Sequence, residues 1–425
     1  MATNSYSIAN QKVVNTQLKH EIRLAQFFNS MIGTAKQTNI TAGGQEAWKM
    51  SGSPINIINQ FRNTGRREMI IPVLGRLLDY GQVGKEQVSG NEEEMSWFWQ
   101  SVFIHLKRKG VLFPDIVDQE AIDWAAKVND YKDVLIQWWA DYEDMDIGLA
   151  YFEGFSKHIT DTTNGLSKAK RYNPNFWCYS GIDWDTATVT RNFENTPTFG
   201  YDPAYLTRIT TALGQVGTVS KNNEMDHYTL EAIAANIAYS RIKGWDVDGD
   251  ECYPLVIHSL QARTLRQDTV WLDAQGRVAG KAAMFKNQIG RWGKIIVIEN
   301  DKVARIPYYS GSTLNFYDYN EGSDDTANGR WQLAQRPPST AGSVQNVACA
   351  ILIGADSMNQ GVYSDLAFKM KTVEDYGMVS GIAGQKFYGN ARNDSYNEDL
   401  GGSSPTAPTD SLPCQSAIIC TRVAQ

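Results

Sequence analysis

The residue types that most often carry out enzyme chemistry are sparse in this sequence. It has five histidines, and no two of them stand two, three or four positions apart, so the usual zinc-binding helix patterns are missing. The sequence also lacks the Gly-x-Ser-x-Gly turn, the Walker phosphate-binding loop and the Rossmann glycine fingerprint. The histidines are His20, His105, His158, His227 and His258. We therefore expect no catalytic residue, no metal and no organic cofactor.

Residues 246–250 read Asp-Val-Asp-Gly-Asp, which resembles the start of a calcium-binding loop. In that loop glycine is the sixth residue and glutamate the twelfth. Here Gly249 is the fourth residue and Ile257 the twelfth. A turn between a helix and a strand is the better interpretation.

Three consecutive carboxylates, Glu92–Glu94, could be taken for catalytic acids. Consecutive residues of a strand point to opposite faces, so these side chains do not converge on one substrate. We interpret them as a solvated cluster or as one that forms salt bridges between subunits. The candidate basic partners are Arg66, Arg67, Lys107 and Arg108.

The five cysteines do not have metal-binding spacing. Their odd number fits a reducing compartment best. Cys414 and Cys420 could pair across a loop, but free buried thiols are favoured. The other three are Cys178, Cys252 and Cys349.

The bulk composition predicts a folded protein. The chain has 425 residues, enough for two or three packed units, with 42% hydrophobic and 20% charged residues. It contains no apolar run of the roughly 20 residues that span a bilayer, and no signal-peptide block precedes Leu18. We expect a soluble protein that is made in a cytoplasm. The net charge of −7 argues against a tight grip on nucleic acid phosphates.

The stretch from Gly65 to Gly110 dominates the pattern. Two runs rich in branched and aromatic side chains, Met69–Leu74 and Met95–Leu106, flank a polar, glycine-rich middle. The connection is too long for a tight hairpin, so it predicts an extended two-stranded ribbon. An isolated ribbon is marginally stable in water, and we expect it to pack against a neighbouring copy of the protein. Two ordinary strands of an intramolecular sheet fit the pattern equally well.

Two further stretches have helical spacing. Apolar residues between Leu18 and Ile32 recur every three or four positions, with Gly33 as a plausible stop. Large side chains from Trp124 to Leu149 recur at alternating steps of four and three, which predicts a long helix over 119–149. A single amphipathic helix packed on a broad surface is favoured over a coiled coil.

A second unit is predicted from Asn223 onwards. Helical and short apolar stretches alternate there, which indicates an α/β layer. Residues 309–343 read as a long surface loop or insertion, and residues 390–413 have loop composition. The predicted strands are 253–258, 294–298, 347–353 and 415–423, and a helix with a serine cap is predicted over 259–267.

The order of these segments resembles the major capsid proteins of N-four-like tailed phages, which have the Hong Kong 97-type capsid fold. The motifs that carry the resemblance are FFNSMIG, GRREMIIPVLGRLLDYGQVGKEQVSGNEEEM, YPLVIHSLQARTLRQD, GRWGKIIVIEND, VACAILIGADS and VEDYG. The resemblance covers about Leu18 to Gly377. It implies an α+β fold with five parts: an N-terminal arm (1–54), an extended β-ribbon loop (55–110), a long spine helix with part of a peripheral domain (111–220), an axial domain (221–361) and a return to the peripheral domain with a C-terminal strand (362–425).

The resemblance also implies a function. Copies would assemble as hexamers and pentamers into an icosahedral shell that encloses double-stranded phage DNA. A portal would be a partner, and decoration proteins are further candidates. Assembly would take place in the bacterial host cytoplasm, away from membranes. The expected contacts between subunits involve Arg66, Arg67, Arg76, Lys85, Glu86, Glu92, Glu93, Glu94, Trp97 and Trp99. The expected packing residues of the spine helix are Trp124, Leu135, Trp138 and Tyr142.

Two alternatives remain open. An encapsulin-like nanocompartment shell has the same fold and would hold an enzyme in place of DNA. A carbohydrate-active enzyme or binding module is suggested by the twelve tryptophans and many tyrosines, and Glu93 would then be the residue to change.

Overall fold

The computed structural model spans the whole chain and describes residues 21–22, 25–34, 36–39, 46–49, 51–59, 68–74, 97–113, 124–154, 173, 175–178, 224–240, 242–247, 249–278, 287–310, 313–316, 347–370, 380–393 and 414–423.

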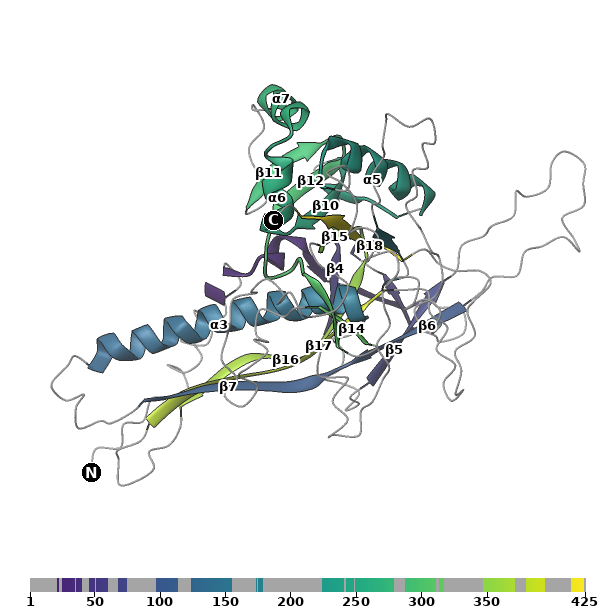
Figure 1. Cartoon of the computed structure of the whole chain (residues 1–425). Coiled ribbons are helices and arrows are strands. Elements are labelled where there is room, and N and C mark those ends of the chain that lie inside the picture. Colours follow the sequence, from purple (N-terminus) through teal and green to yellow (C-terminus); the bar gives the residue numbers. More distant parts are fainter. Residues whose placement is uncertain are drawn as a thin grey trace, which may run out of the picture.

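A long helix, α3 (Trp124–Glu153), runs along the body of the molecule (Figure 1). Its 30 residues correspond to about 45 Å at 1.5 Å per residue. The predicted long helix is therefore confirmed. Residues 114–123 lie outside the described part, and the helix ends at Glu153, beyond the predicted Leu149.

A sheet of five strands, the lower sheet, lies under this helix with its long strands running beside it (Figure 1). Its order is β1-β4-β16-β17-β7. The pairs β1–β4 and β4–β16 are parallel, and β16–β17 and β17–β7 are antiparallel. The strands are β1 (Ile32–Thr34), β4 (Ile55–Ile58), β16 (Met358–Met370), β17 (Ser380–Arg392) and β7 (His105–Phe113).

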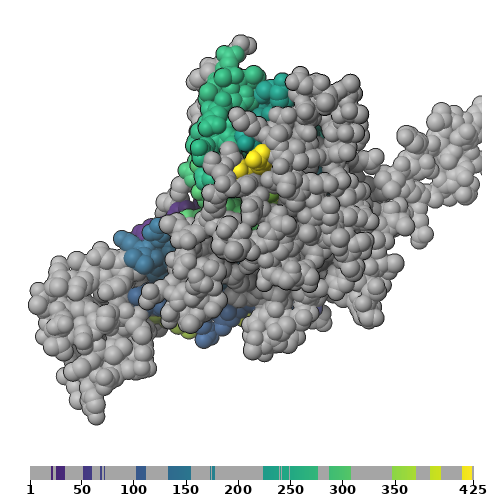
Figure 2. Space-filling model, viewed as in Figure 1, coloured from purple at the N-terminus to yellow at the C-terminus, as the bar shows by residue number. Residues whose placement is uncertain are grey.

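A second, mixed sheet of seven strands forms the other half, the upper sheet. Its order is β11-β12-β10-β15-β18-β8, and β9 pairs with β10. Helices α5, α6 and α7 accompany it, and its green and teal residues form the protrusion at the top of the space-filling view (Figure 2). The elements are β11 (Gln288–Trp292), β12 (Ile295–Glu299), β10 (Asp250–Ile257), β15 (Val347–Ile353), β18 (Ser416–Arg422), β8 (Phe176–Cys178), β9 (Trp245–Val247), α5 (His227–Tyr239), α6 (Ser259–Leu265) and α7 (Thr269–Val278).

The remaining elements are three antiparallel strand pairs and a short 3-10 helix. The predicted ribbon is one of the pairs, with Glu68 opposite Phe103 and Leu74 opposite Trp97. The elements are η1 (Phe28–Met31), β2 (Lys36–Asn39) with β3 (Glu46–Lys49), β5 (Glu68–Leu74) with β6 (Trp97–Phe103), and β13 (Pro307–Ser310) with β14 (Thr313–Phe316).

The central strands of the upper sheet are buried on both faces. Cys349 and Ile351 of β15 belong to a core that includes the end of α3, whereas Ala350 and Leu352 belong to a core shared with α5 and α6. Because both faces are covered, β15 is a continuous apolar run rather than an alternating one. The strand predicted over 347–353 is confirmed at both ends.

Several local predictions are also confirmed. Strands β10, β12 and β18 lie where apolar runs predicted them. A turn at Gly249 lies between strands β9 and β10 rather than between a helix and a strand, and Asp246 Oδ1 accepts the Gly249 backbone N–H at 3.0 Å. Gly249 has a φ of +86°, which explains the glycine.

The predicted N-terminal helix is wrong beyond Ala25. Residues Phe28–Met31 form a 3-10 helix, and Ile32 and Gly33 belong to strand β1. The α-helical ladder stops because the backbone N–H groups of Phe27 and Phe28 bond to Asp144 of α3. A local apolar spacing could not reveal this distant acceptor.

Two smaller predictions need correction. The N-cap of α6 is His258 rather than a serine, because the N–H of Ser259 bonds to Asp301 at 2.6 Å and the His258 ring accepts from Leu260. The insertion predicted over 309–343 overlaps the paired strands β13 and β14, and residues 311–312 and 317–346 lie outside the described part.

The predicted domain boundaries stay a prediction, and several strands lie across them. Strands β4 and β7, within the predicted loop region 55–110 or at its end, belong to the lower sheet. Strands β8 and β18, assigned with the peripheral domain, belong to the upper sheet. The chain therefore passes between the two sheets more often than a linear division suggests.

Candidate functional site

The ribbon that was predicted to contact other copies is described only at its base. Trp97 and Trp99 are on strand β6, but their side chains lie outside the described part. The other predicted contact residues also lie outside it, namely Arg66, Arg67, Arg76, Lys85, Glu86, Glu92, Glu93 and Glu94. The contacts between subunits thus remain a prediction.

The base of the ribbon packs on its own subunit. Ile71 of β5 and Val102 of β6 are fully buried, together with Ile58 of β4 and Ala391 of β17. The expectation that the ribbon has no surface to pack on within its own chain is therefore wrong for this part. The predicted second strand is also divided: β6 ends at Phe103, and β7 begins at His105 and joins the lower sheet.

Lys107 of β7 is a buried cation under helix α3. Its Nζ donates to Asp146 Oδ2 at 2.7 Å and to the hydroxyl of Tyr388 at 3.3 Å. Burial lowers the pKa of Lys107, and the nearby Asp146 carboxylate opposes that shift. Lys107 therefore holds α3 to the lower sheet, and the prediction that it serves the ribbon glutamates is wrong.

A second buried ion pair lies next to the first. Lys386 of β17 donates to Glu143 Oε2 of α3 at 2.7 Å, and Gln26 donates to the same oxygen at 2.6 Å. Asn390 adds a hydrogen bond to Asp146 at 2.9 Å. We call the group Lys107, Glu143, Asp146 and Lys386 the helix–sheet junction.

Asp144 connects the N-terminal segment to the same helix. Its carboxylate accepts the backbone N–H of Phe27 at 2.8 Å and that of Phe28 at 3.3 Å. Burial raises the pKa of Asp144 to about 7, although these two hydrogen bonds act in the opposite direction. A polar anchor thus holds the start of η1, while Phe28 and Met31 are fully buried in the core.

The helix residues named from the sequence have different surroundings. Leu135 is buried against the lower sheet. Trp138 stacks on Tyr142 with 4.8 Å between ring centroids, and Lys109 lies over the Trp138 ring. Trp124 is in the helix, but its side chain lies outside the described part.

The second half of α3 is buried on all sides, which the single predicted apolar stripe did not indicate. Residues 143–154 are all buried, including Glu143, Asp144 and Asp146. Two carbonyls of this half accept from arginines: Arg305 donates to Met145 O at 2.9 Å and Arg392 to Tyr151 O at 2.7 Å. The sequence signal for this region is the acidic run 141–146 inside an aromatic helix, because a buried carboxylate requires a partner.

This arrangement holds several elements in place rather than exposing reactive groups. Within the described ranges, no group of three or more His, Cys, Asp or Glu side chains could hold a metal ion. No helix in the part of the chain that the structure describes is long and apolar enough to cross a membrane.

The helix–sheet junction connects α3 to the lower sheet and, through Gln26, to the N-terminal segment.

No protein-family model matches the sequence, and no curated protein matches it. Solved phage capsids, however, match the structure over most of the chain. The capsid of Ralstonia phage GP4 is 15% identical, with a TM-score of 0.55 over 94% of this chain and 92% of that chain. The cyanophage Pam1 capsid is 13% identical, with a TM-score of 0.55 over 94% and 93%. The head of Helicobacter pylori bacteriophage KHP40 is 11% identical, with a TM-score of 0.52 over 94% and 91%.

At these identities the likeness establishes the fold. The chain has the Hong Kong 97-type fold of tailed-phage capsids, a mixed α/β architecture with a long helix and two main sheets. The predicted fold is confirmed.

Proposed function

We propose that this protein is a major capsid protein whose copies assemble into the icosahedral head of a tailed phage. The observation that carries the proposal is coverage: the likeness to the GP4 capsid extends over 94% of this chain and 92% of that one. At this coverage the shared part includes residues of both sheets and of α3. The motifs quoted above support an N-four-like lineage within this class.

In this proposal the ribbon reaches a neighbouring copy. Its base is held by the buried side chains of Ile71 and Val102, and in this proposal the residues between Leu74 and Trp97 make the contact with the neighbouring copy. Contacts of this kind join unlike surfaces and close into rings by rotation. Charged residues such as Arg76, Lys85, Glu92 and Glu93 set the register of these contacts more than their strength.

In this proposal the two sheets belong to different domains of the capsid fold. The lower sheet with α3 corresponds to the peripheral domain and the upper sheet to the axial domain, near the centre of hexamers and pentamers. A portal and decoration proteins complete the list of proposed partners. A net charge of −7 suits a wall that encloses double-stranded DNA without binding it tightly. The proposed location is the virion, assembled in the bacterial host cytoplasm.

The direct test is electron microscopy of the expressed full chain. We expect shells, capsomers or tubes that depend on protein and salt concentration. A protein that stays monomeric at high concentration under every salt condition would contradict the proposal. Copurification of a packaged enzyme instead of DNA would favour the nanocompartment alternative.

The role of the ribbon is tested by deletion of Leu78–Asn91. We expect a folded subunit with unchanged circular dichroism and no assembly, because the base keeps its own packing while the ribbon becomes too short to contact a neighbour. In a second variant a Gly/Ser linker of equal length replaces the same residues. It tests whether assembly needs only the length of the segment or also its side chains. If the deletion unfolds the subunit, the segment belongs to the interior of the chain and the proposed contact is wrong.

A further inference from the structure

A disulfide joins two strands in the middle of the upper sheet. Cys349 of β15 and Cys420 of β18 stand directly opposite each other, with their Cα atoms 4.3 Å apart. The sequence favoured free thiols and considered only Cys414 as a partner for Cys420. That expectation is wrong, because strand register rather than distance along the chain brings the two cysteines together.

The hydrogen-bond pattern explains why this position suits a disulfide. The backbone N–H and C=O of Cys349 bond to Arg305, at 2.8 and 3.1 Å, rather than to Cys420. Opposite residues without mutual hydrogen bonds are the ones whose side chains come closest in an antiparallel pair. The register alone therefore places the two sulfur atoms within bonding reach.

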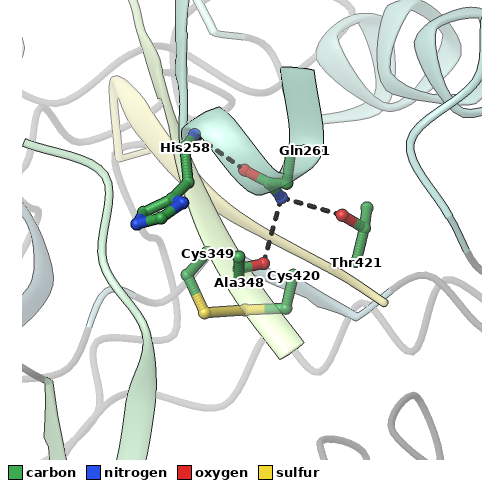
Figure 3. Close-up of a disulfide and its surroundings, with 6 residues drawn as sticks. All are labelled: His258, Gln261, Ala348, Cys349, Cys420 and Thr421. Atoms are coloured by element: carbon green, nitrogen blue, oxygen red, sulfur yellow. Dashed lines mark hydrogen bonds between the residues drawn. A yellow bond between two sulfur atoms is a disulfide. The ribbon is translucent and has the colours of Figure 1, made fainter. Parts of the chain in front are cut away.

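The bond is enclosed on every side. Cys349 and Cys420 are both 0% exposed and belong to the core that contains Ile147 and Tyr151 of α3. From the other face of the sheet, Gln261 of α6 donates to Ala348 O at 3.0 Å and to Thr421 Oγ1 at 2.8 Å (Figure 3). A thiolate that exchanges with a disulfide must reach one sulfur atom, and here it can do so only when the sheet opens.

The bond also closes a loop that crosses the molecule. The two cysteines are separated by 71 positions. Between them the chain leaves the upper sheet after β15, forms β16 and β17 of the lower sheet, and returns as β18. The disulfide lies at the point where this excursion begins and ends.

We propose that Cys349 and Cys420 form a shielded redox lock, whose state is set while the upper sheet folds and is then retained. The bond forms by exchange with a low-molecular-weight disulfide such as oxidised glutathione. One protein thiolate attacks it and releases one thiol, and the second protein thiolate displaces the other. The protein thiols together lose two protons and two electrons, and the reagent leaves as two thiols. This inference is independent of the proposed function.

The first test is a count of free thiols in protein from cells with an oxidising cytoplasm. Alkylation in denaturant without reductant is expected to modify three of the five cysteines, and the other two, Cys349 and Cys420, only after reduction. Modification of all five before reduction would overturn the proposal.

The second test concerns shielding. In excess dithiothreitol, the native protein is expected to lose the bond at least about 100-fold more slowly than the unfolded protein, because exchange requires opening of the sheet. Protein from ordinary cells, with the pair reduced, is expected to resist oxidised glutathione in the same way. Equal rates in native and unfolded protein would show that the pair is not shielded.

A double variant isolates the effect of the bond on β18. Cys349→Ala with Cys420→Ala is expected to speed hydrogen exchange in residues 416–422 by at least about tenfold relative to the oxidised protein. The control is Cys252→Ala, which removes a buried cysteine of β10 that is outside the disulfide. A similar acceleration in the control would mean that packing, not the bond, holds the strand.

Discussion

At the scale of single residues, the helix–sheet junction is unusual because four charged side chains balance one another inside the protein. Lys107 and Asp146 are each 3% exposed in their side chains, and Lys386 and Glu143 are 10% and 5% exposed. Removing one partner from such a pair is costly, because the remaining charge stays buried without compensation. These groups therefore have clear consequences for stability.

We expect Lys107→Met to lower the free energy of unfolding by about 3–5 kcal/mol, because Asp146 would remain buried without its cation. Lys109→Met is the matched control, since Lys109 is exposed on the same strand and its loss should change stability by less than about 1 kcal/mol. Denaturant unfolding of both variants measures the difference. Equal effects would show that the buried pair contributes little.

Asp144 predicts a dependence of stability on pH. Its pKa in the folded protein, about 7, lies above the ordinary value of 3.8, so the folded state holds the proton more tightly than the unfolded state. The contribution of Asp144 to stability is therefore complete below about pH 4 and is lost as the pH rises through about 7, by about 4 kcal/mol in total.

Asp144→Asn tests this sign, because asparagine is neutral at every pH and keeps one oxygen acceptor for the Phe27 N–H. The difference in free energy of unfolding between the variant and the wild type should shift in favour of the variant between pH 4 and pH 8. Denaturant titrations at both values measure it. Parallel pH profiles of the two proteins would rule out a raised pKa at this carboxylate.

At the scale of elements, the prediction from sequence was accurate where one strand or helix decides its own pattern. Strand β15 is apolar at every position because both of its faces are buried, and the large side chains of α3 recur at alternating steps of four and three. The prediction failed where the local structure depends on a partner far along the chain, as at Phe27 and Phe28, whose N–H groups bond to Asp144. The buried charges of α3 were missed for the same reason, since their lysine partners are on other strands.

Strand β17 crosses the base of the ribbon with no room for a side chain at Gly389. A Cβ atom there would lie 1.6 Å from the carbonyl oxygen of Phe103, a backbone atom that cannot move aside. We expect Gly389→Ala to destabilise the subunit by at least about 2 kcal/mol, because the added methyl group overpacks a closed contact. Thermal unfolding measures this, and a change within experimental error would mean that the ribbon base is displaced easily.

At the scale of the whole molecule, the resemblance of the ordered motifs indicated the correct fold, but spacing alone could not have done so. The order of strands within each sheet depends on pairings between distant segments, such as Ile418 with Phe176. The Cys349–Cys420 bond could not be predicted from the sequence either, since it follows from the register of β15 and β18. The ribbon contacts between copies remain a prediction.

The position of β18 has a consequence for the growing chain on the ribosome. This strand lies between β15 and β8 in the upper sheet, yet its residues are translated more than two hundred positions after β8. Until β18 is available to pair, the nascent upper sheet has a gap between β15 and β8, and β15 has an unpaired apolar edge. Unpaired edges of this kind invite association with other chains. A pause in translation before residue 416 would therefore prolong the time for which this edge is open to other chains.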